Sequence, residues 1–227
     1  ETAASAAYAR ALARASVLTA AELESILTGL ERVRRRIAEG ESLDRFEDIH
    51  SAVELLLTEE TGDAGLRLHT GRSRNEQVAV DEKLFLKAEL PMLSAGIARV
   101  RHAAVELASA YPEAIVPGYT HLQPGQYVLF AHYFLSLLGP LDRAQSRLDE
   151  ALRRLDFCPL GSGALAGSTV PLDREALAAD LGFSGSTANS MDAVSDRSYI
   201  LDVLYALAVL HLDLARFAED FIIFATR

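Results

Sequence analysis

The chain has 227 residues, half of them hydrophobic, and a formal net charge of −10. This length suits one large domain or two small ones, with ample apolar material for a core. Nucleic-acid binding normally needs a basic face, so we expect no nucleic-acid partner for so acidic a chain. The single cysteine, Cys158, excludes an internal disulfide and suits a reducing cytoplasm.

Helical patterns dominate the chain and strand signals are nearly missing, so we expect an all-α protein. Thr19 and Glu22 form a capping-box pattern at the start of one helix, which should stop near Gly40. Kinks are expected at Pro91 and at Gly139-Pro140. The expected helices cover residues 1–15, 19–40, 44–60, 75–110, 124–155, 173–181 and 192–226.

The last of these segments is apolar in nearly every direction around its axis between Ile200 and Phe224. A helix of this kind has to be buried on all sides. One chain of this size offers few helices to surround it, so we expect cover from helices of other subunits. It is not a membrane span, because charged residues interrupt it at Asp202, Asp213, Arg216, Glu219 and Asp220.

Two polar turns are the strongest functional signals in the sequence. The first, residues 68–77, reads LHTGRSRNEQ and precedes a long helical pattern. The second, residues 117–123, reads PGYTHLQ, and we expect a helix to follow it as well. Helix N-termini offer unpaired N–H groups and a favourable dipole for anions. The two turns therefore predict binding of a small molecule that carries carboxylates.

His121 is the first candidate for chemistry, because imidazole can take or relay a proton near neutral pH. The alternative is a histidine at a helix terminus that bonds a carbonyl. Asn75 offers a neutral donor, and its alternative is a plain helix N-cap. Arg72 and Arg74 could pair with carboxylates in bidentate geometry, although we expect at least one of them to be structural.

Other sites find less support. His50 lies at helical spacing from Glu47 and Glu54, which indicates a hydrogen-bonded structural histidine, and His132 falls in an apolar run typical of a core. No spacing of His, Cys and Asp resembles a metal site. The glycines of residues 161–167 are spaced G-x-G-x-x-x-G and follow a helix, so they do not form a dinucleotide-binding loop.

Taken together, these motifs resemble the argininosuccinate lyases, within the fumarase/aspartase superfamily of fumarate-releasing enzymes, which includes delta-crystallin. The family's N-terminal Ser-bearing segment and its Ser-Ser-x-Met-Pro-x-Lys-x-Asn signature loop are absent, so we interpret the chain as a fragment. The matching segments follow in order over nearly the whole chain: FEDIHSAVE (46–54), LHTGRSRNEQVAVD (68–81), GYTHLQPGQ (118–126), CPLGSGALAGSTVPLDRE (158–175) and NSMDAVSDRSYILD (189–202).

The resemblance implies a long-helix bundle with a smaller N-terminal helical domain. We place an incomplete N-terminal domain at residues 1–74 and an incomplete central bundle at residues 75–227. The implied activity is cofactor-independent anti elimination of fumarate from argininosuccinate, leaving arginine. The implied assembly is a cytoplasmic homotetramer with shared active sites, in which the turns 69–75 and 118–123 come from different subunits. Without the signature loop, the fragment alone should be inactive.

The resemblance also implies roles for single residues. His121 falls on the family's active-site histidine, and Thr120 and Asn75 fall on its substrate-binding threonine and asparagine. Glu76 stands where the family usually has Asp. Four further residues lie in matching segments and are assigned to substrate binding: Arg72, Arg74, Gln123 and Arg197.

Two alternatives stay open. One is another fumarate-releasing lyase, such as an adenylosuccinate or aspartate lyase, although the segment LHTGRSRN argues against it. The other is a non-catalytic structural protein like the lens crystallins. The presence of His121 and Asn75 argues against this second alternative.

Overall fold

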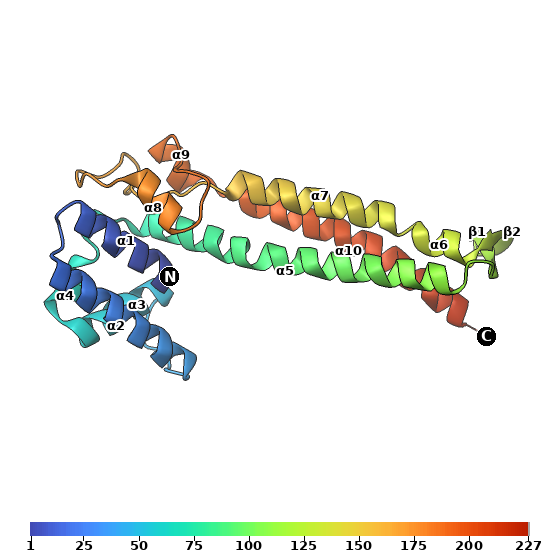
Figure 1. Cartoon of the computed structure of the whole chain (residues 1–227), viewed down its shortest axis with the longest axis horizontal. Helices are drawn as coiled ribbons and strands as arrows, with labels where there is room; N and C mark the ends of the chain where they lie inside the picture. The colour runs from blue at the N-terminus through green and yellow to red at the C-terminus, as the bar shows by residue number, and fades with distance from the viewer. Residues whose placement is uncertain (227) are drawn as a thin grey trace. The chain divides into compact units, whose positions relative to one another are not determined.

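A computed structural model describes residues 1–226, and it is mostly helical, as expected from the sequence (Figure 1). One small antiparallel hairpin interrupts the helices. The elements in chain order are α1 (Thr2–Arg14), α2 (Ala20–Ala38), α3 (Ile49–Thr61), α4 (Asp63–Arg67), α5 (Arg74–Ala110), β1 (Ile115–Thr120), β2 (Gln123–Leu129), α6 (Phe130–Leu135), α7 (Leu138–Leu155), α8 (Arg174–Asp180), α9 (Ser190–Ser195) and α10 (Ser198–Ala225).

The chain forms two compact units. Unit 1 comprises residues 1–85 and 156–197, and unit 2 comprises residues 86–155 together with the chain from residue 198 onward. Helix α5 begins in unit 1 and continues into unit 2. The domain boundary expected between residues 74 and 75 stays a prediction.

Unit 1 is built around the first three helices and α8, whose apolar faces share one core. Its fully buried side chains include Tyr8, Leu12, Ile26, Leu56 and Leu177. Local sequence sets where these helices begin. The predicted capping box is present at α2, and Asp173 caps α8 as expected. Helix α3 begins at residue 49 instead of the expected 44, because the Asp48 carboxylate accepts the Ser51 N–H at 2.6 Å and caps it there.

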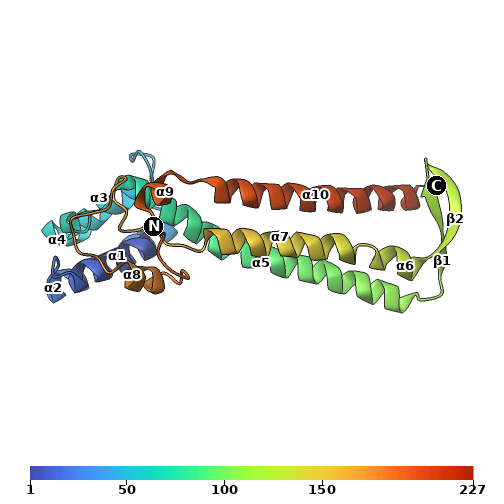
Figure 2. The same ribbon diagram turned by 90° about the horizontal axis from the view of Figure 1, so that it is seen from above.

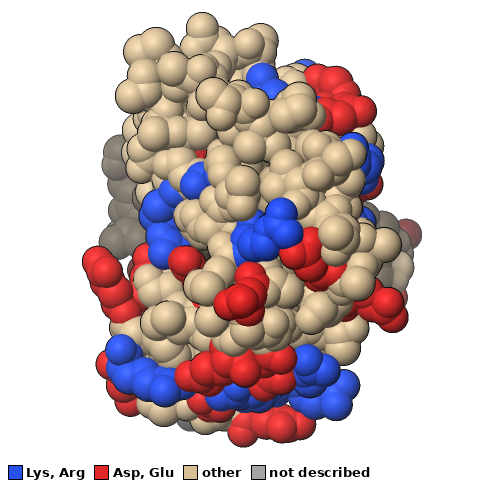
Figure 3. All heavy atoms as spheres, turned by 90° about the vertical axis from the view of Figure 1, so that its left-hand side faces the viewer, with Lys and Arg blue, Asp and Glu red and all other residues tan. Residues whose placement is uncertain are grey.

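A group of ion pairs joins α2 to the end of α3 on the surface of unit 1. Arg36 lies 3.1 Å from Glu41, 3.2 Å from Glu59 and 3.0 Å from Glu60. Figure 3 shows acidic and basic side chains side by side along the lower part of this face of the molecule. Exposed pairs of this kind each contribute about 0–1 kcal/mol, so they supplement the apolar core of the unit.

In unit 2, α7 and α10 run beside the part of α5 that follows residue 85 (Figures 1 and 2). Their shared core contains Leu90, Ile97, Leu141, Leu148 and Val203. This core covers only one side of α10. Large apolar side chains on the rest of its surface are exposed, namely Leu201 by 67%, Leu204 by 54%, Tyr205 by 62%, Leu212 by 63% and Ile222 by 62%.

The prediction of a helix over residues 124–155 is wrong for its first residues. Residues 115–129 form the β1–β2 hairpin instead, with Ile115 opposite Leu129 and Thr120 opposite Gln123. β-Branched and aromatic side chains are frequent in these strands and favour extended backbone, whereas Pro117 and Pro124 disfavour a helix interior.

Two other helix boundaries also differ from expectation. The sequence predicts a kink at Gly139-Pro140, but these residues lie in the first turn of α7. Proline is tolerated there because its missing N–H would have no helical partner. The last helix is divided into α9 and α10 at residues 196–197. Pro91 does lie inside α5, and the kink expected there stays a prediction. His132, expected in the core, is exposed.

No helix within residues 1–226 combines the length and the apolar character needed to cross a membrane.

Substitutions of two adjacent leucines of α3 test how tightly the core of unit 1 is packed. Leu56 is fully buried, whereas Leu55 is 54% exposed. Leu56→Ala should lower the free energy of unfolding by about 2–5 kcal/mol, because it removes buried methyl groups and leaves a cavity. Leu55→Ala is the matched control and should change it far less. Denaturant unfolding measures both, and equal losses would contradict this packing.

Candidate active site

The first polar turn leads into α5 through a capping arrangement. The Ser73 hydroxyl accepts the backbone N–H of Asn75 at 3.3 Å, and the Glu76 carboxylate accepts the backbone N–H of Ser73 at 3.0 Å. Ser73 therefore occupies the position before the helix, and Asn75 lies within its first turn. The alternative that Asn75 is the N-cap is wrong, which leaves its side chain available for other partners.

The Asn75 side chain is exposed, and its amide nitrogen donates to the carbonyl of Ala164 at 3.1 Å. A primary amide carries two N–H groups, so this bond leaves a second donor for a ligand. Ala164 belongs to the glycine-containing segment 161–167, which lies against the turn. The structure thus brings together two of the segments that the sequence motifs singled out.

Gly163 allows that close approach. Its φ is +62°, and a Cβ at this position would lie 2.4 Å from the carbonyl oxygen of Gly167. Its backbone N–H donates to Glu76 Oε2 at 3.0 Å, within a buried environment. Only glycine fits here without a shift of backbone, so the sequence GSGALAG serves a tight loop fold instead of a dinucleotide site.

The two arginines of the first turn play different parts. Arg72 is 8% exposed, donates to Ser5 Oγ at 3.0 Å and lies 5.1 Å from the centre of the Tyr8 ring. Burial lowers the pKa of its guanidinium, although nearby carboxylates oppose the shift. A side chain held in this way is structural, as expected for at least one of the pair.

Arg74 is about one-third exposed and faces the start of α3. Its guanidinium donates to Gln77 Oε1 at 2.9 Å and lies 3.7 Å from a carboxylate oxygen of Glu54. Arg197 is similarly exposed and pairs with Glu82 at 3.0 Å, while it also donates to the carbonyl of Asp196 at 2.7 Å. Both side chains have protein partners and also reach solvent.

The second polar turn is the tip of the hairpin in unit 2. Thr120 and Gln123 face each other across it, and the two residues between them have positive φ, 54° at His121 and 59° at Leu122. Two left-handed residues in succession are typical of a type I′ hairpin turn. The helix-terminus alternative for His121 is therefore wrong. Thr120, His121 and Gln123 are all exposed.

The backbone at this tip is unusual. Histidine tolerates the left-handed region better than most residues, but a bulky leucine there is uncommon. Leu122 is 72% exposed, so burial of its own side chain does not stabilise the turn. Strained backbone conformations are concentrated at functional sites, so this observation supports a functional role for the tip.

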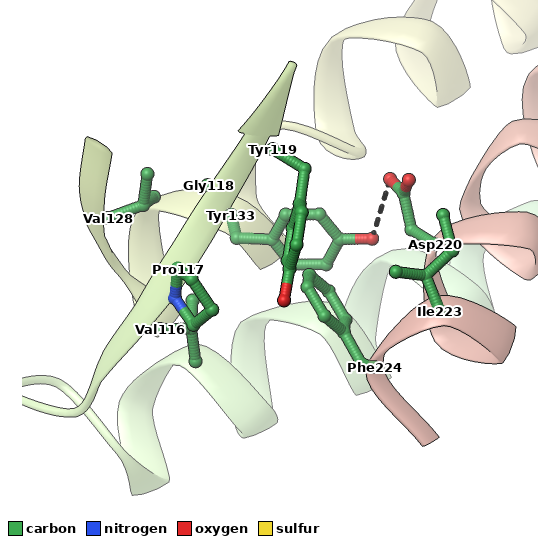
Figure 4. A pocket seen from close by; sticks show the side chains of 9 residues that line it. All are labelled: Val116, Pro117, Gly118, Tyr119, Val128, Tyr133, Asp220, Ile223 and Phe224. Atoms are coloured by element: carbon green, nitrogen blue, oxygen red, sulfur yellow. Dashed lines mark hydrogen bonds between the residues drawn. The ribbon is translucent and has the colours of Figure 1, made fainter. Parts of the chain in front are cut away.

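An apolar pocket of about 210 Å³ lies at the base of the same hairpin (Figure 4). Tyr119 and Phe224 line it, and the Tyr133 hydroxyl donates to Asp220 at 3.0 Å. Burial and this bond raise the pKa of Tyr133. Neither Thr120 nor His121 lines the pocket, so we regard it as a contact of the hairpin with α10 and not as the reaction centre.

Unit 1 also holds a buried charge network around His50. Its Nδ1 atom lies 3.1 Å from Glu1 Oε2 and 3.3 Å from Asp81 Oδ2. Its role as a hydrogen-bonded histidine is confirmed, but its partners are not the expected Glu47 and Glu54. The hydrogen bonds to Asp81 and Glu1 raise the pKa of His50 to about 9. Burial raises the pKa of Asp81 as well.

The predicted site residues thus lie in two groups. Arg72, Arg74, Asn75 and Arg197 belong to unit 1, and Thr120, His121 and Gln123 belong to unit 2. Sequence reasoning missed the bridging role of Glu76. The spacing Ser-x-x-Glu at residues 73–76 is a capping-box signal and could have pointed to it.

Comparison with known proteins adds to this geometry. A family model described as "Lyase" matches residues 1–227. The chain belongs to this lyase family. It is 46% identical over 222 residues to argininosuccinate lyase from Moorella thermoacetica, with 97% of the chain and 48% of that protein covered. It is 43% identical to argininosuccinate lyase from Halorhodospira halophila, with the same shares covered. The resemblance seen in the motifs is confirmed, and the chain spans about half the length of these relatives.

Solved structures agree with the lyase family's fold. An EDDS lyase variant with bound fumarate superimposes with a TM-score of 0.91 at 28% identity and covers 99% of this chain and 44% of its own. A fumarate lyase from Mesorhizobium sp. BNC1 superimposes with a TM-score of 0.80 at 24% identity, with 99% of this chain and 54% of that one covered.

The His50 network predicts a pH dependence of stability. The pKa of His50 is higher in the folded state than its ordinary value near 6.5. The stabilisation is therefore complete below pH 6.5 and is lost as the pH rises through about 9. Melting temperatures from pH 6 to 10 should fall more steeply for the unchanged protein than for His50→Asn. Parallel curves would contradict the raised pKa.

Proposed function

We propose that the protein is an argininosuccinate lyase, which splits argininosuccinate into arginine and fumarate. The observation that carries this proposal is the identity of 43–46% to curated argininosuccinate lyases over 97% of the chain. The geometry is compatible with that chemistry, since an exposed amide begins α5 and an exposed imidazole and hydroxyl occupy the hairpin tip.

The reaction removes a proton from the carbon next to a carboxylate and breaks the C–N bond on the opposite side. The electrons of the broken C–H bond form the double bond of fumarate, and the leaving nitrogen takes up a proton. Negative charge grows on the carboxylate meanwhile, and well-placed donors stabilise it by roughly 3–4 kcal/mol each. In this scheme Asn75 and Thr120 donate to that carboxylate, and His121 takes, relays or tunes the proton. The elimination is redox-neutral and requires no cofactor.

Arg74, Arg197 and Gln123 complete the proposed binding site. The two arginines are partly exposed, so substrate carboxylates could compete for them with Glu54 and Glu82. Arg72 acts on substrate only indirectly, because Ser5 and Tyr8 hold it in the interior of unit 1. This modifies the assignment made from the sequence, in which Arg72 was itself a substrate ligand.

We further propose a cytoplasmic homotetramer whose active sites combine the turns 69–75 and 118–123 from different subunits. The exposed apolar side chains of α10 support the assembly, because a patch of this kind normally marks an interface. The exposed hairpin tip is suited to reach a neighbouring subunit. Cys158 is a free buried thiol, as suits a reducing compartment.

A second candidate is another fumarate-releasing lyase with a different amine product. The observation in its favour is the TM-score of 0.91 to an EDDS lyase variant that has fumarate bound. Supplying argininosuccinate and related amino-dicarboxylates separately to the full-length protein distinguishes the two. Fumarate released from argininosuccinate together with arginine supports the first proposal, and fumarate from another substrate alone supports the second.

His121 provides the main test of the chemistry. In the full-length protein, His121→Asn should lower kcat by roughly 10²- to 10⁴-fold, which is the usual contribution of acid–base assistance. Ultraviolet absorbance follows fumarate release. His102→Asn is the matched control, since His102 is an exposed histidine on α5 outside both turns, and its kcat should be unchanged. A folded His121→Asn protein with a normal kcat would contradict the role given to His121, whereas a folded unchanged full-length protein that releases no fumarate would favour a structural, crystallin-like role.

The assembly proposal predicts self-association through α10. Leu204 and Leu212 are 54% and 63% exposed, and replacing both with Asp should weaken association because charges would be buried at the interface. Light scattering at micromolar concentration should report a tetramer for the unchanged protein and smaller species for the variant. Asp replacements at Leu55 and Leu66, exposed leucines of unit 1, serve as the control. A monomeric unchanged protein would contradict the proposal.

A further inference from the structure

The Glu76 side chain joins two backbone segments that are far apart in sequence. One carboxylate oxygen accepts the N–H of Ser73 at 3.0 Å, and the other accepts the N–H of Gly163 at 3.0 Å. The Glu76 side chain is 0% exposed, and its bond to Gly163 is fully buried, whereas the bond to Ser73 is partly buried. Bonds from backbone N–H groups to a carboxylate are charge-assisted and therefore stronger than neutral ones.

These bonds determine where Asn75 can point. Its side chain is exposed, and the neighbour that orients it is the carbonyl of Ala164 at 3.1 Å from Nδ2. Ala164 directly follows Gly163, whose N–H is held by Glu76. The bond from Gly167 N–H to the Ser162 carbonyl, at 2.7 Å, closes the same loop. A shift of Gly163 would therefore move the Ala164 carbonyl and with it the amide of Asn75.

We propose that Glu76 is a positioning residue for the lyase reaction, which fixes the loop 161–167 against the turn 73–75 so that the Asn75 amide meets the developing charge. This inference rests on the proposed function of Asn75. Glu76 itself is buried and does not touch substrate. A glutamine at this position would present an NH₂ group to one of the two N–H donors, so one bond would be replaced by a repulsive contact.

The test uses the full-length protein and separates kcat from KM. Glu76→Gln should lower kcat roughly 10- to 100-fold with a smaller change in KM, because misplacement of a donor mainly weakens transition-state binding. Glu76→Asp keeps both acceptor oxygens and should retain most of the activity. The matched control is Glu175→Gln, since the Glu175 carboxylate accepts the Ser186 hydroxyl at 2.5 Å and its N–H at 3.3 Å elsewhere in unit 1. Its kcat should be unchanged.

A double-mutant comparison decides whether Glu76 acts through Asn75. In an Asn75→Leu background, Glu76→Gln should have almost no further effect on kcat, since the donor it positions has gone. An equal fold-change in both backgrounds would overturn the proposal, as would a normal kcat for Glu76→Gln. A normal kcat for Asn75→Leu alone would refute the role of Asn75 in the proposed function while leaving the Glu76 contacts to be judged separately.

Amide hydrogen exchange in the unchanged protein makes that separate judgement and does not depend on a variant that folds. The N–H groups of Ser73 and Gly163 should exchange slowly, because both are bonded to a buried carboxylate. Rapid exchange at Gly163 would show that the bridge is absent in solution and would overturn the proposal.

Discussion

The apolar surface of α10 is the constraint on which the rest of the protein depends. Unit 2 buries Tyr199, Val203 and Ala206 from this helix, but it leaves large apolar side chains on its other sides in water. At about 25 cal/mol per Å², leaving such side chains exposed is costly, so covering them by association is strongly favoured. In the proposed assembly, an active site built from several subunits needs little additional contact, because the α10 surfaces already bring the subunits together.

Within residues 1–226, unit 1 differs from unit 2 in that it buries charged side chains. Glu76 and Arg72 are almost fully removed from water, and each has polar or aromatic partners close by. Burying a charge without partners costs several kcal/mol, so such groups fix the backbone that supplies the partners. For Glu76 those partners are N–H groups of the polar turn and of the loop 161–167, and for Arg72 they are the side chains of Ser5 and Tyr8. The exposed Asn75 amide is thus attached to a backbone that charge-assisted hydrogen bonds to the buried Glu76 hold in place.

The sequence predicted most of the helices because their signals are local. The capping pattern of Thr19 and Glu22 and the cap at Asp173 depend on three or four neighbouring residues, and both were confirmed. The partners of His50 could not be found in this way, since Glu1 and Asp81 are brought to it by tertiary packing. For the same reason, the motif match located Asn75 but not the Ala164 carbonyl that orients its amide.

The second polar turn is expected from the sequence to begin a helix, but it forms the tip of a hairpin. In a sequence, a two-residue hairpin turn is usually recognised by the dipeptide Asn-Gly or Asp-Gly. In this chain His121 and Leu122 occupy the two left-handed positions instead. Substituting Asn-Gly would relieve the backbone but would delete the imidazole. A helix start would have kept His121 close to its own helix, whereas the tip of a hairpin projects it away from the bundle. The unfavourable backbone is therefore consistent with selection for where the imidazole is presented, at the expense of local stability.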